Sequence, residues 1–155
     1  MCRIVSDKLH VFYALAAMAK NVRLPNIIRK RSPLHGYGVF AGETINKNKR
    51  IVEYAGELVP NQQSEAREER YLAQGCIWVF RVNRQWSRDA AVGGNIARFI
   101  NHSCRPNCWI EIVERTIWIR ASKQIHKGEE LTYDYATDGE RTIPCRCHPS
   151  CTNKF

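Results

Sequence analysis

Hydrophobic and polar positions divide the chain into a short helical beginning and a longer β-rich remainder. Between residues 7 and 20, apolar side chains recur at helical spacing, which predicts an amphipathic helix that Pro25 ends. From Ile27 onward the apolar runs are short and are separated by Gly and Asn turns. This pattern predicts a mainly β fold with short helices, preceded by a helical leader over residues 1–25.

Individual elements can be placed within the β-rich part. One helix is predicted over residues 64–74, with Ser64 as its capping residue and Gly75 as its stop. Residues 109–121 alternate as a β-hairpin that turns at Glu114-Arg115. Further strands are predicted over residues 39–41, 50–55, 76–83 and 131–133.

The charge of the chain indicates the kind of partner it meets. The 155 residues suit one compact domain, and the formal net charge is +9. Such a surplus favours acidic partners: nucleic acid, an anionic membrane or an acidic protein assembly. The densest basic run, Arg29-Lys30-Arg31, is short, so we interpret it as a solvated surface turn rather than a dedicated nucleic-acid patch.

The cysteines favour metal binding over disulfides. Three of the seven, Cys145, Cys147 and Cys151, crowd near the C-terminus, and no secretory signal is recognisable: the apolar run over residues 11–19 is too short to span a bilayer. We therefore expect a reducing, intracellular compartment in which these thiolates bind zinc. A tetrahedral site needs a fourth ligand, and a distant cysteine suits this role better than His148, which is squeezed between two ligands.

Three other stretches carry side chains suited to chemistry. Gly36 and Gly38 allow the backbone to approach a ligand, because neither has a Cβ, although a tight structural turn explains them equally well. Residues 94–108 pack polar side chains, a thiol and a proline turn into one segment. Strand alternation places Tyr133 and Tyr135 on one face, either as a core pair or as the wall of a polar-tipped aromatic slot.

Taken together and in this order, these stretches resemble the SET-domain protein-lysine methyltransferases. The resemblance runs from Arg29 to the end and is closest to the trithorax/mixed-lineage-leukaemia branch, while compact bacterial or viral SET proteins are also similar. It rests on residues 32–40, 53–57, 98–104 and 128–135 and on the final Cys-x-Cys-x-x-x-Cys. It implies a SET domain of small curved β-sheets with a C-terminal pseudoknot over residues 26–137, followed by a post-SET zinc-binding segment over residues 138–155.

The resemblance also implies a set of site residues. S-adenosylmethionine would be the methyl donor, and the target lysine would enter from the opposite face. Tyr135 matches the catalytic tyrosine, and Tyr54 and Tyr133 would line the lysine channel. The residues implied at the donor site are His35, Gly36, Tyr37, Gly38, Trp78, Arg98, Asn101 and His102. Those implied around one structural zinc are Cys104, Cys145, Cys147 and Cys151.

These residue types suit methyl transfer. The reaction needs a neutral lysine amine aligned with the donor, so positioning supplies much of the acceleration. A free lysine has a pKa of about 10.4, and neutralising it at pH 7 costs roughly 4–5 kcal/mol. A desolvating aromatic slot beside a positive sulfonium lowers that pKa. Tyr135 would orient the amine, with a Tyr135 phenolate base as the alternative. A Tyr at position 133 goes, within the family, with mono- or dimethylation.

Three departures from the family pattern keep a rival interpretation open. The Cys147 to Cys151 spacing is one residue short of the usual post-SET spacing, Trp78 stands where relatives often carry Tyr, and the short leader stands in place of a cysteine-rich pre-SET region. The chain could thus be a catalytically weak, SET-like peptide-binding module. A nucleic-acid-binding protein is a second rival, but no base-reading motif is visible.

The expected partner is a histone or another lysine-containing protein. The basic charge would favour association with nucleosomes, and no membrane partner is expected. The protein would lie in the nucleus on chromatin in a eukaryote, and in the cytoplasm in a bacterium.

Overall fold

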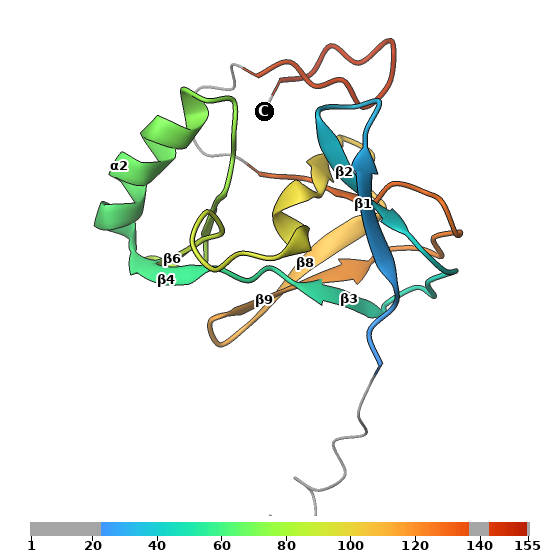
Figure 1. Cartoon of the computed structure of the whole chain (residues 1–155), viewed down its shortest axis with the longest axis horizontal. Helices are drawn as coiled ribbons and strands as arrows, with labels where there is room; N and C mark the ends of the chain where they lie inside the picture. Colours follow the sequence, from blue (N-terminus) through green and yellow to red (C-terminus); the bar gives the residue numbers. More distant parts are fainter. Residues whose placement is uncertain (1–22, 137–142, 155) are drawn as a thin grey trace, which may run out of the picture.

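The computed structural model describes residues 23–136 and 143–154, so the leader helix predicted over residues 7–20 lies outside the described residues (Figure 1). Small sheets dominate, with one α-helix, α2 (Asn61–Leu72), and one 3-10 helix, η1 (Ile96–Phe99), among these residues. The predicted mainly β fold with short helices is confirmed. The strands are β1 (Ile27–Arg31), β2 (Tyr37–Ala41), β3 (Arg50–Glu53), β4 (Glu57–Pro60), β5 (Val79–Arg81), β6 (Trp86–Asp89), β7 (Asn101–His102), β8 (Cys108–Val113), β9 (Thr116–Ala121) and β10 (Thr132–Tyr133).

The core lies on the inner face of the β3-β9-β8 sheet. Strand β9 pairs with β3 on one side and with β8 on the other, both antiparallel. Side chains alternate along β9, so Ile117, Ile119 and Ala121 are fully buried while Trp118 and Arg120 face outward. The β8-β9 hairpin matches the predicted hairpin, and Glu114 takes a positive φ of 56° at its turn.

Helix α2 begins three residues before the predicted start. Ser64 lies inside the first turn, buried, and its hydroxyl donates to the carbonyl of Asn61 at 2.8 Å. The cap position is Pro60, which offers no side-chain cap; instead the Asn61 N–H donates to the Gln85 carbonyl at 3.0 Å. A tertiary contact thus replaces the predicted Ser cap. The helix ends near Gly75 as predicted, and Gly75 has a φ of +72°.

Two predicted strands are shorter in the structure. Strand β3 ends at Glu53 rather than at residue 55. Strand β5 covers only Val79–Arg81 of the predicted residues 76–83. The Cys76 N–H donates to the Tyr71 carbonyl in the last turn of α2, so this residue is bonded to the helix end and does not join the strand.

The basic triplet forms a strand, which corrects the expected surface turn. Residues 29–31 belong to β1, which pairs with β2, and the turn follows at residues 32–36, where Gly36 has a φ of +47°. The cationic groups lie over aromatic rings: the Arg31 guanidinium is 4.4 Å from the Tyr37 ring centroid, and the Lys30 ammonium is 4.1 Å from that of Phe40. Pairing with an aromatic-bearing strand outweighs the turn tendency of the charged run.

A parallel pair of short strands brings distant segments together. Thr132 pairs with Asn101 and Tyr133 pairs with His102, and the Ser103 N–H donates to the Tyr133 carbonyl at 3.2 Å. The Asn-His segment and the tyrosine strand, which are far apart in the sequence, therefore lie side by side. Figure 1 shows these segments near the middle of the molecule, between β1-β2 and the β3-β9-β8 sheet.

Candidate active site and metal centre

The loop between β1 and β2 is held by the side chain of Asn101. Its Nδ2 lies 3.3 Å from the His35 carbonyl, 3.1 Å from the Tyr37 carbonyl and 2.8 Å from Glu130 Oε1. Because Asn101 belongs to β7, these contacts fix the loop against the parallel strand pair. The structure therefore brings together His35, Tyr37 and Asn101, three of the residues implied for the donor site.

The two glycines of this loop have different surroundings. A Cβ on Gly38 would collide with the carboxyl group of Glu130, which also accepts a hydrogen bond from the Ser32 hydroxyl at 2.9 Å. A Cβ on Gly36 would meet nothing within 4 Å, so the space beside its backbone is open. A backbone loop that is anchored on one side and open on the other fits a group that binds through main-chain contacts.

Three tyrosines converge in one groove of about 1000 Å³. Tyr54 and Tyr133 are 2% and 5% exposed, and the rings of Tyr133 and Tyr135 are 4.9 Å apart. Two of the hydroxyls are anchored on backbone carbonyls: that of Tyr135 donates to Ile100 at 2.8 Å, and that of Tyr54 donates to Trp78 at 3.0 Å. These tyrosines line the groove as a polar-tipped aromatic slot, while Tyr54 and Tyr133 also belong to the hydrophobic core, so both sequence interpretations fit the structure.

The phenols of this slot stay protonated at neutral pH. Burial, followed by the negative charge of Glu130, raises the pKa of Tyr135 above its usual value. Burial is also the main cause that raises the pKa of Tyr54 and of Tyr133. A phenolate is therefore costly here, which disfavours Tyr135 as a general base.

His102 lies between the tyrosine slot and the cysteines. Its Nδ1 accepts a hydrogen bond from the Tyr135 N–H at 3.3 Å and is 3.6 Å from Asp134 Oδ1, while Nε2 is 3.4 Å from Cys104 Sγ. Burial lowers the pKa of His102, and the Asp134 charge opposes this shift. The imidazole connects the parallel strand pair to the thiol cluster.

Trp78 and Arg98 pack against each other. The Arg98 guanidinium lies 5.3 Å from the Trp78 ring centroid, and its Nη1 donates to the Ala90 carbonyl at 3.2 Å. The groove is lined by the neighbours Ile77 and Val79, whereas Trp78 is not among its described lining residues. Trp78 contacts the tyrosine slot through its backbone carbonyl, which accepts the hydrogen bond from the Tyr54 hydroxyl.

The four cysteines implied as zinc ligands meet at one point. The sulfur atoms of Cys104, Cys145, Cys147 and Cys151 all lie within 4.8 Å of one another. Cys104 Sγ is 3.5 Å from that of Cys145 and 4.0 Å from that of Cys151. Tetrahedral zinc with bonds of about 2.3 Å holds sulfurs about 3.8 Å apart, so the set is compatible with a structural zinc ion.

The thiols of the cluster differ in pKa, and His148 lies outside the cluster. Burial raises the pKa of Cys145 to about 12. At Cys147 burial is outweighed by hydrogen bonds, first from the Cys104 backbone, which lower the pKa to about 7. His148 Nδ1 lies 3.2 Å from the Ser150 hydroxyl and is outside the cluster. The distant cysteine, Cys104, lies beside the other three thiols, whereas His148 does not.

Sequence reasoning missed two polar residues that hold the site. Glu130 anchors the loop as described, and buried Asn107 donates to the Glu130 carbonyl at 2.8 Å and accepts from the Thr132 N–H at 2.9 Å. Both lie inside stretches that had been singled out, residues 94–108 and 128–135. Their proximity to each other depends on the fold, so the sequence carried only a weak signal for their role.

The sequence profile of the SET domain matches residues 36–136. The chain therefore belongs to the SET-domain family. Among its relatives, histone-lysine N-methyltransferase trr of Drosophila melanogaster is 42% identical over 135 residues, which cover 81% of this chain. Histone-lysine N-methyltransferase 2D of Homo sapiens is 42% identical over 79% of this chain. The H3 lysine-4 specific histone-lysine N-methyltransferase of Neurospora crassa is 43% identical over 81% of it.

The predicted likeness to the trithorax/mixed-lineage-leukaemia branch is confirmed by these relatives. The aligned region spans only 6%, 2% and 10% of the fly, human and fungal proteins, respectively. Among the part of the chain that the structure describes, no helix is long and apolar enough to span a membrane.

Solved structures with the same fold include Chaetomium thermophilum Polycomb Repressive Complex 2. Its autoinhibited form, bound to S-adenosylmethionine, has a TM-score of 0.68 and 31% sequence identity, covering 74% of this chain and 15% of that chain. The same complex bound to GSK126 has a TM-score of 0.67 and 32% identity. The predicted SET fold is confirmed, and a neighbour of this fold binds S-adenosylmethionine.

Proposed function

We propose that this chain is an S-adenosylmethionine-dependent protein-lysine N-methyltransferase that acts on a histone tail or another basic protein segment. One observation carries the proposal: the tyrosine slot and the β1-β2 loop are joined through consecutive residues. The Tyr135 hydroxyl is anchored on the Ile100 carbonyl, and the next residue, Asn101, holds the His35 and Tyr37 carbonyls. A reacting amine and a donor bound at these two places would be fixed relative to each other.

On the donor side, the loop of His35, Gly36, Tyr37 and Gly38 offers its backbone, with Asn101 and His102 beside it. Arg98 and Trp78 complete this side by packing together. S-adenosylmethionine, when bound, supplies a methyl group on a positively charged sulfur. The names of the relatives and the S-adenosylmethionine-bound neighbour support this assignment.

On the lysine side, Tyr54 and Tyr133 line a desolvated channel that favours the neutral amine. The Tyr135 hydroxyl donates a hydrogen bond to the Ile100 carbonyl, and a phenol oxygen that donates in this way can also accept a hydrogen bond from the amine N–H. Tyr135 thereby orients the amine, and the amine proton leaves through water. No ionised side chain is needed for this step, which agrees with the raised pKa of Tyr135.

We further propose that the product is mono- or dimethyl-lysine, because the buried Tyr133 hydroxyl occupies space beside the amine. Incubating the chain with labelled donor and histone H3, followed by mass spectrometry, tests both proposals. We expect methylated lysine with few trimethyl groups, and more trimethyl product from Tyr133→Phe. Mainly trimethyl-lysine from the wild type would contradict the product assignment but not the activity.

The rival function is a peptide-binding module with weak turnover. It predicts that histone peptides bind but that no labelled lysine forms across a panel of lysine-containing proteins. The anchored Tyr135 favours the enzyme. Methylation of histones would also place the protein in the nucleus of a eukaryote, which fractionation or microscopy of the tagged protein can check.

A further inference from the structure

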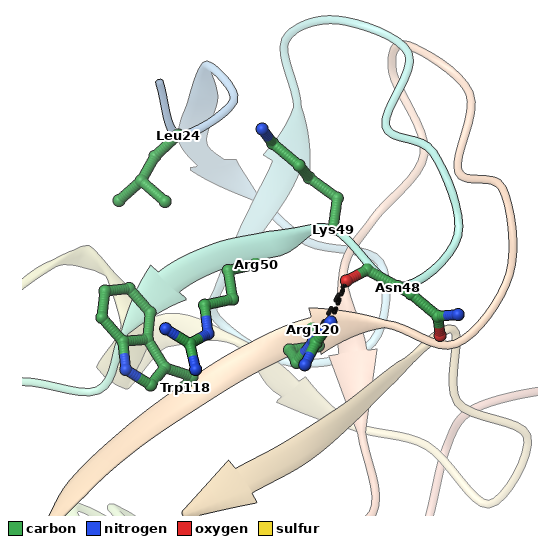
Figure 2. Close-up of a pocket in the computed structure, with 6 residues that line it drawn as sticks. All are labelled: Leu24, Asn48, Lys49, Arg50, Trp118 and Arg120. Carbon is green, nitrogen blue, oxygen red and sulfur yellow. Dashed lines mark hydrogen bonds between the residues drawn. The ribbon is translucent and has the colours of Figure 1, made fainter. Parts of the chain in front are cut away.

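The outer face of the β3-β9-β8 sheet carries a pocket that the proposed reaction does not use. The register pairs Arg50 with Arg120 and Glu111 with Trp118, so these side chains share the face opposite the buried isoleucines. The pocket has a volume of about 570 Å³ (Figure 2). The residues that line it are Leu24, Asn48, Lys49, Arg50, Trp118 and Arg120.

The cations of this basic pocket are held in unequal ways. Glu111 accepts hydrogen bonds from Arg50 Nε at 2.8 Å and from Arg120 Nη1 at 2.5 Å, and these bonds outweigh burial to lower the pKa of Glu111. Arg120 is further engaged with the Asn48 carbonyl, through Nε at 3.0 Å. Among the described residues, the two terminal nitrogens of Arg50 and the Lys49 ammonium have no hydrogen-bond or ion-pair partner.

Two tryptophans fix the guanidinium groups in place. The Arg50 guanidinium lies 5.0 Å from the Trp118 ring centroid, and that of Arg120 lies 5.1 Å from the Trp109 ring centroid. In Figure 2 the Arg50 side chain extends toward Trp118, while Lys49 points toward Leu24 across the pocket. Guanidinium groups held on indole rings lose little freedom on binding an anion.

We propose that this basic pocket binds backbone phosphates of duplex DNA. Free N–H donors on Arg50 and Lys49 suit phosphate oxygens. The cations of Lys49, Arg50 and Arg120 outnumber the carboxylates of Glu111 and Glu53, which the register places on the same face, so the face is positive. The guanidiniums occupy indole faces, which leaves those faces unsuited to stacking unpaired bases and so favours duplex over single strands. The net charge of +9 adds to the attraction.

The position of the pocket leaves the groove free for a peptide. On the hairpin, Ile110 and Ile112 line the groove from the face opposite Arg50, and Trp109, which lies under the Arg120 guanidinium, also lines the groove. The basic pocket and the groove therefore adjoin at Trp109, while Lys49 and Arg50 lie outside the groove. The DNA proposal does not depend on the methyltransferase proposal, because it concerns binding alone.

The test measures the affinity of the whole 155-residue chain for a labelled 30-base-pair duplex by fluorescence anisotropy between about 50 and 200 mM salt. The variant Lys49→Ala/Arg50→Ala removes the Lys49 ammonium and the Arg50 guanidinium, which carry N–H donors without a partner among the described residues. The matched control, Lys123→Ala/Lys127→Ala, removes the same charge from the exposed loop before Leu131. We expect the first variant to bind about tenfold more weakly, with a log–log salt slope smaller by about 2, and the control to bind like the wild type.

Three results would overturn the proposal. An equal loss in both variants would show a general charge effect rather than a site. Tighter binding of a single-stranded oligonucleotide at the same salt would exclude duplex as the ligand, and displacement by polyglutamate as effective as by unlabelled duplex would indicate an acidic protein instead. Since Arg50 also pairs with Glu111, Lys49→Glu alone carries the same test if the double variant unfolds.

Discussion

The two sides of the groove are built in different ways. The insert region, residues 57–89, forms one wall from β4, α2, β5 and β6, which follow one another along the chain and pair locally. The crossing region, residues 35–38, 101–104 and 130–135, joins segments that are distant in sequence. The contacts of Asn101 there span 66, 64 and 29 positions. One wall is thus a local unit, whereas the chemistry depends on long-range assembly.

Each region has a carboxylate that anchors it. In the insert region Asp89 is fully buried, and its Oδ2 accepts hydrogen bonds from Arg67 at 2.9 Å and from the Tyr71 hydroxyl at 3.1 Å, which ties α2 to β6. In the crossing region Glu130 is bonded to Ser32 and Asn101. We therefore expect substitutions in the crossing region to change rate and donor affinity, and substitutions in the insert region to change stability and peptide affinity.

The largest effect is expected for Tyr135→Phe. Losing the hydroxyl that is anchored on Ile100 should lower kcat at least about 100-fold with little change in the KM for peptide, because the amine still enters but is no longer oriented. Initial rates with labelled donor measure this. A rise in the KM for peptide with kcat unchanged would show that Tyr135 contributes only to substrate binding.

The pH profile of the same variant separates orientation from base catalysis. The raised pKa of Tyr135 keeps its phenol neutral below its usual pKa of about 10, so only the lysine loses a proton as pH rises. We expect the rate to rise up to about tenfold per pH unit above pH 7, in the wild type and in Tyr135→Phe alike. Loss of this rise in the variant alone would point to a phenolate base.

A second large effect is expected at the thiol cluster. The wild type should bind about one zinc ion per chain, and Cys145→Ser should lower zinc affinity by at least about tenfold because it removes one of four ligands. Elemental analysis and competition with a chromogenic chelator measure both quantities. Cys76→Ser is the matched control, since Cys76 lies outside the cluster, and equal zinc loss in both variants would argue against these ligands.

A smaller effect is expected for Asn101→Ala. Removing its amide leaves the His35 and Tyr37 carbonyls without this partner, at a cost of about 1–3 kcal/mol, so donor affinity should fall about tenfold or more. Calorimetric titration with S-adenosylmethionine measures it. Asn46→Ala, at an exposed turn, should leave the affinity unchanged. An unchanged affinity for S-adenosylmethionine in Asn101→Ala would show that this side chain does not support binding of the methyl donor.

The smallest effect is expected in the insert region. Asp89→Asn should lower the thermal unfolding midpoint by about 5 °C and raise the peptide KM a few-fold, because α2 loses its buried anchor. Donor affinity should stay the same. Glu57→Gln, which alters the exposed partner of Arg67, should shift the midpoint by less. A loss of donor affinity in Asp89→Asn would show that the two regions are coupled.

The sequence predicted the crossing region more accurately than the insert region, although the crossing region depends on contacts between distant segments. The proximity of the residues of the long-range crossing region, including Asn101, Tyr135 and Cys104, was foreseen because a resemblance carries spatial information that local patterns lack. Local rules alone could not have brought Cys104 to Cys145, since 41 positions separate them.

The local insert region was predicted less accurately. Ser64 had the residue type of a cap, yet the start of α2 is set by Asn61, whose side chain accepts from the Ser87 hydroxyl at 2.8 Å and donates to the Asn83 carbonyl at 3.1 Å. These partners come from β6 and from the turn before it, which a local helix rule does not include. Likewise, the cations of residues 29–31 gave a turn signal that pairing with β2 overrides.

The parallel pairing of β7 with β10 also bears on how the protein acquires its activity while it is being made. Contacts between distant segments close large loops and form after local hairpins such as β8-β9. Tyr133 and Tyr135 are synthesised after nearly all the described strands. A nascent chain can therefore form its other sheets before the tyrosine slot exists. During refolding, secondary structure should therefore return before donor binding does, and the chain should pass through a folded but inactive stage.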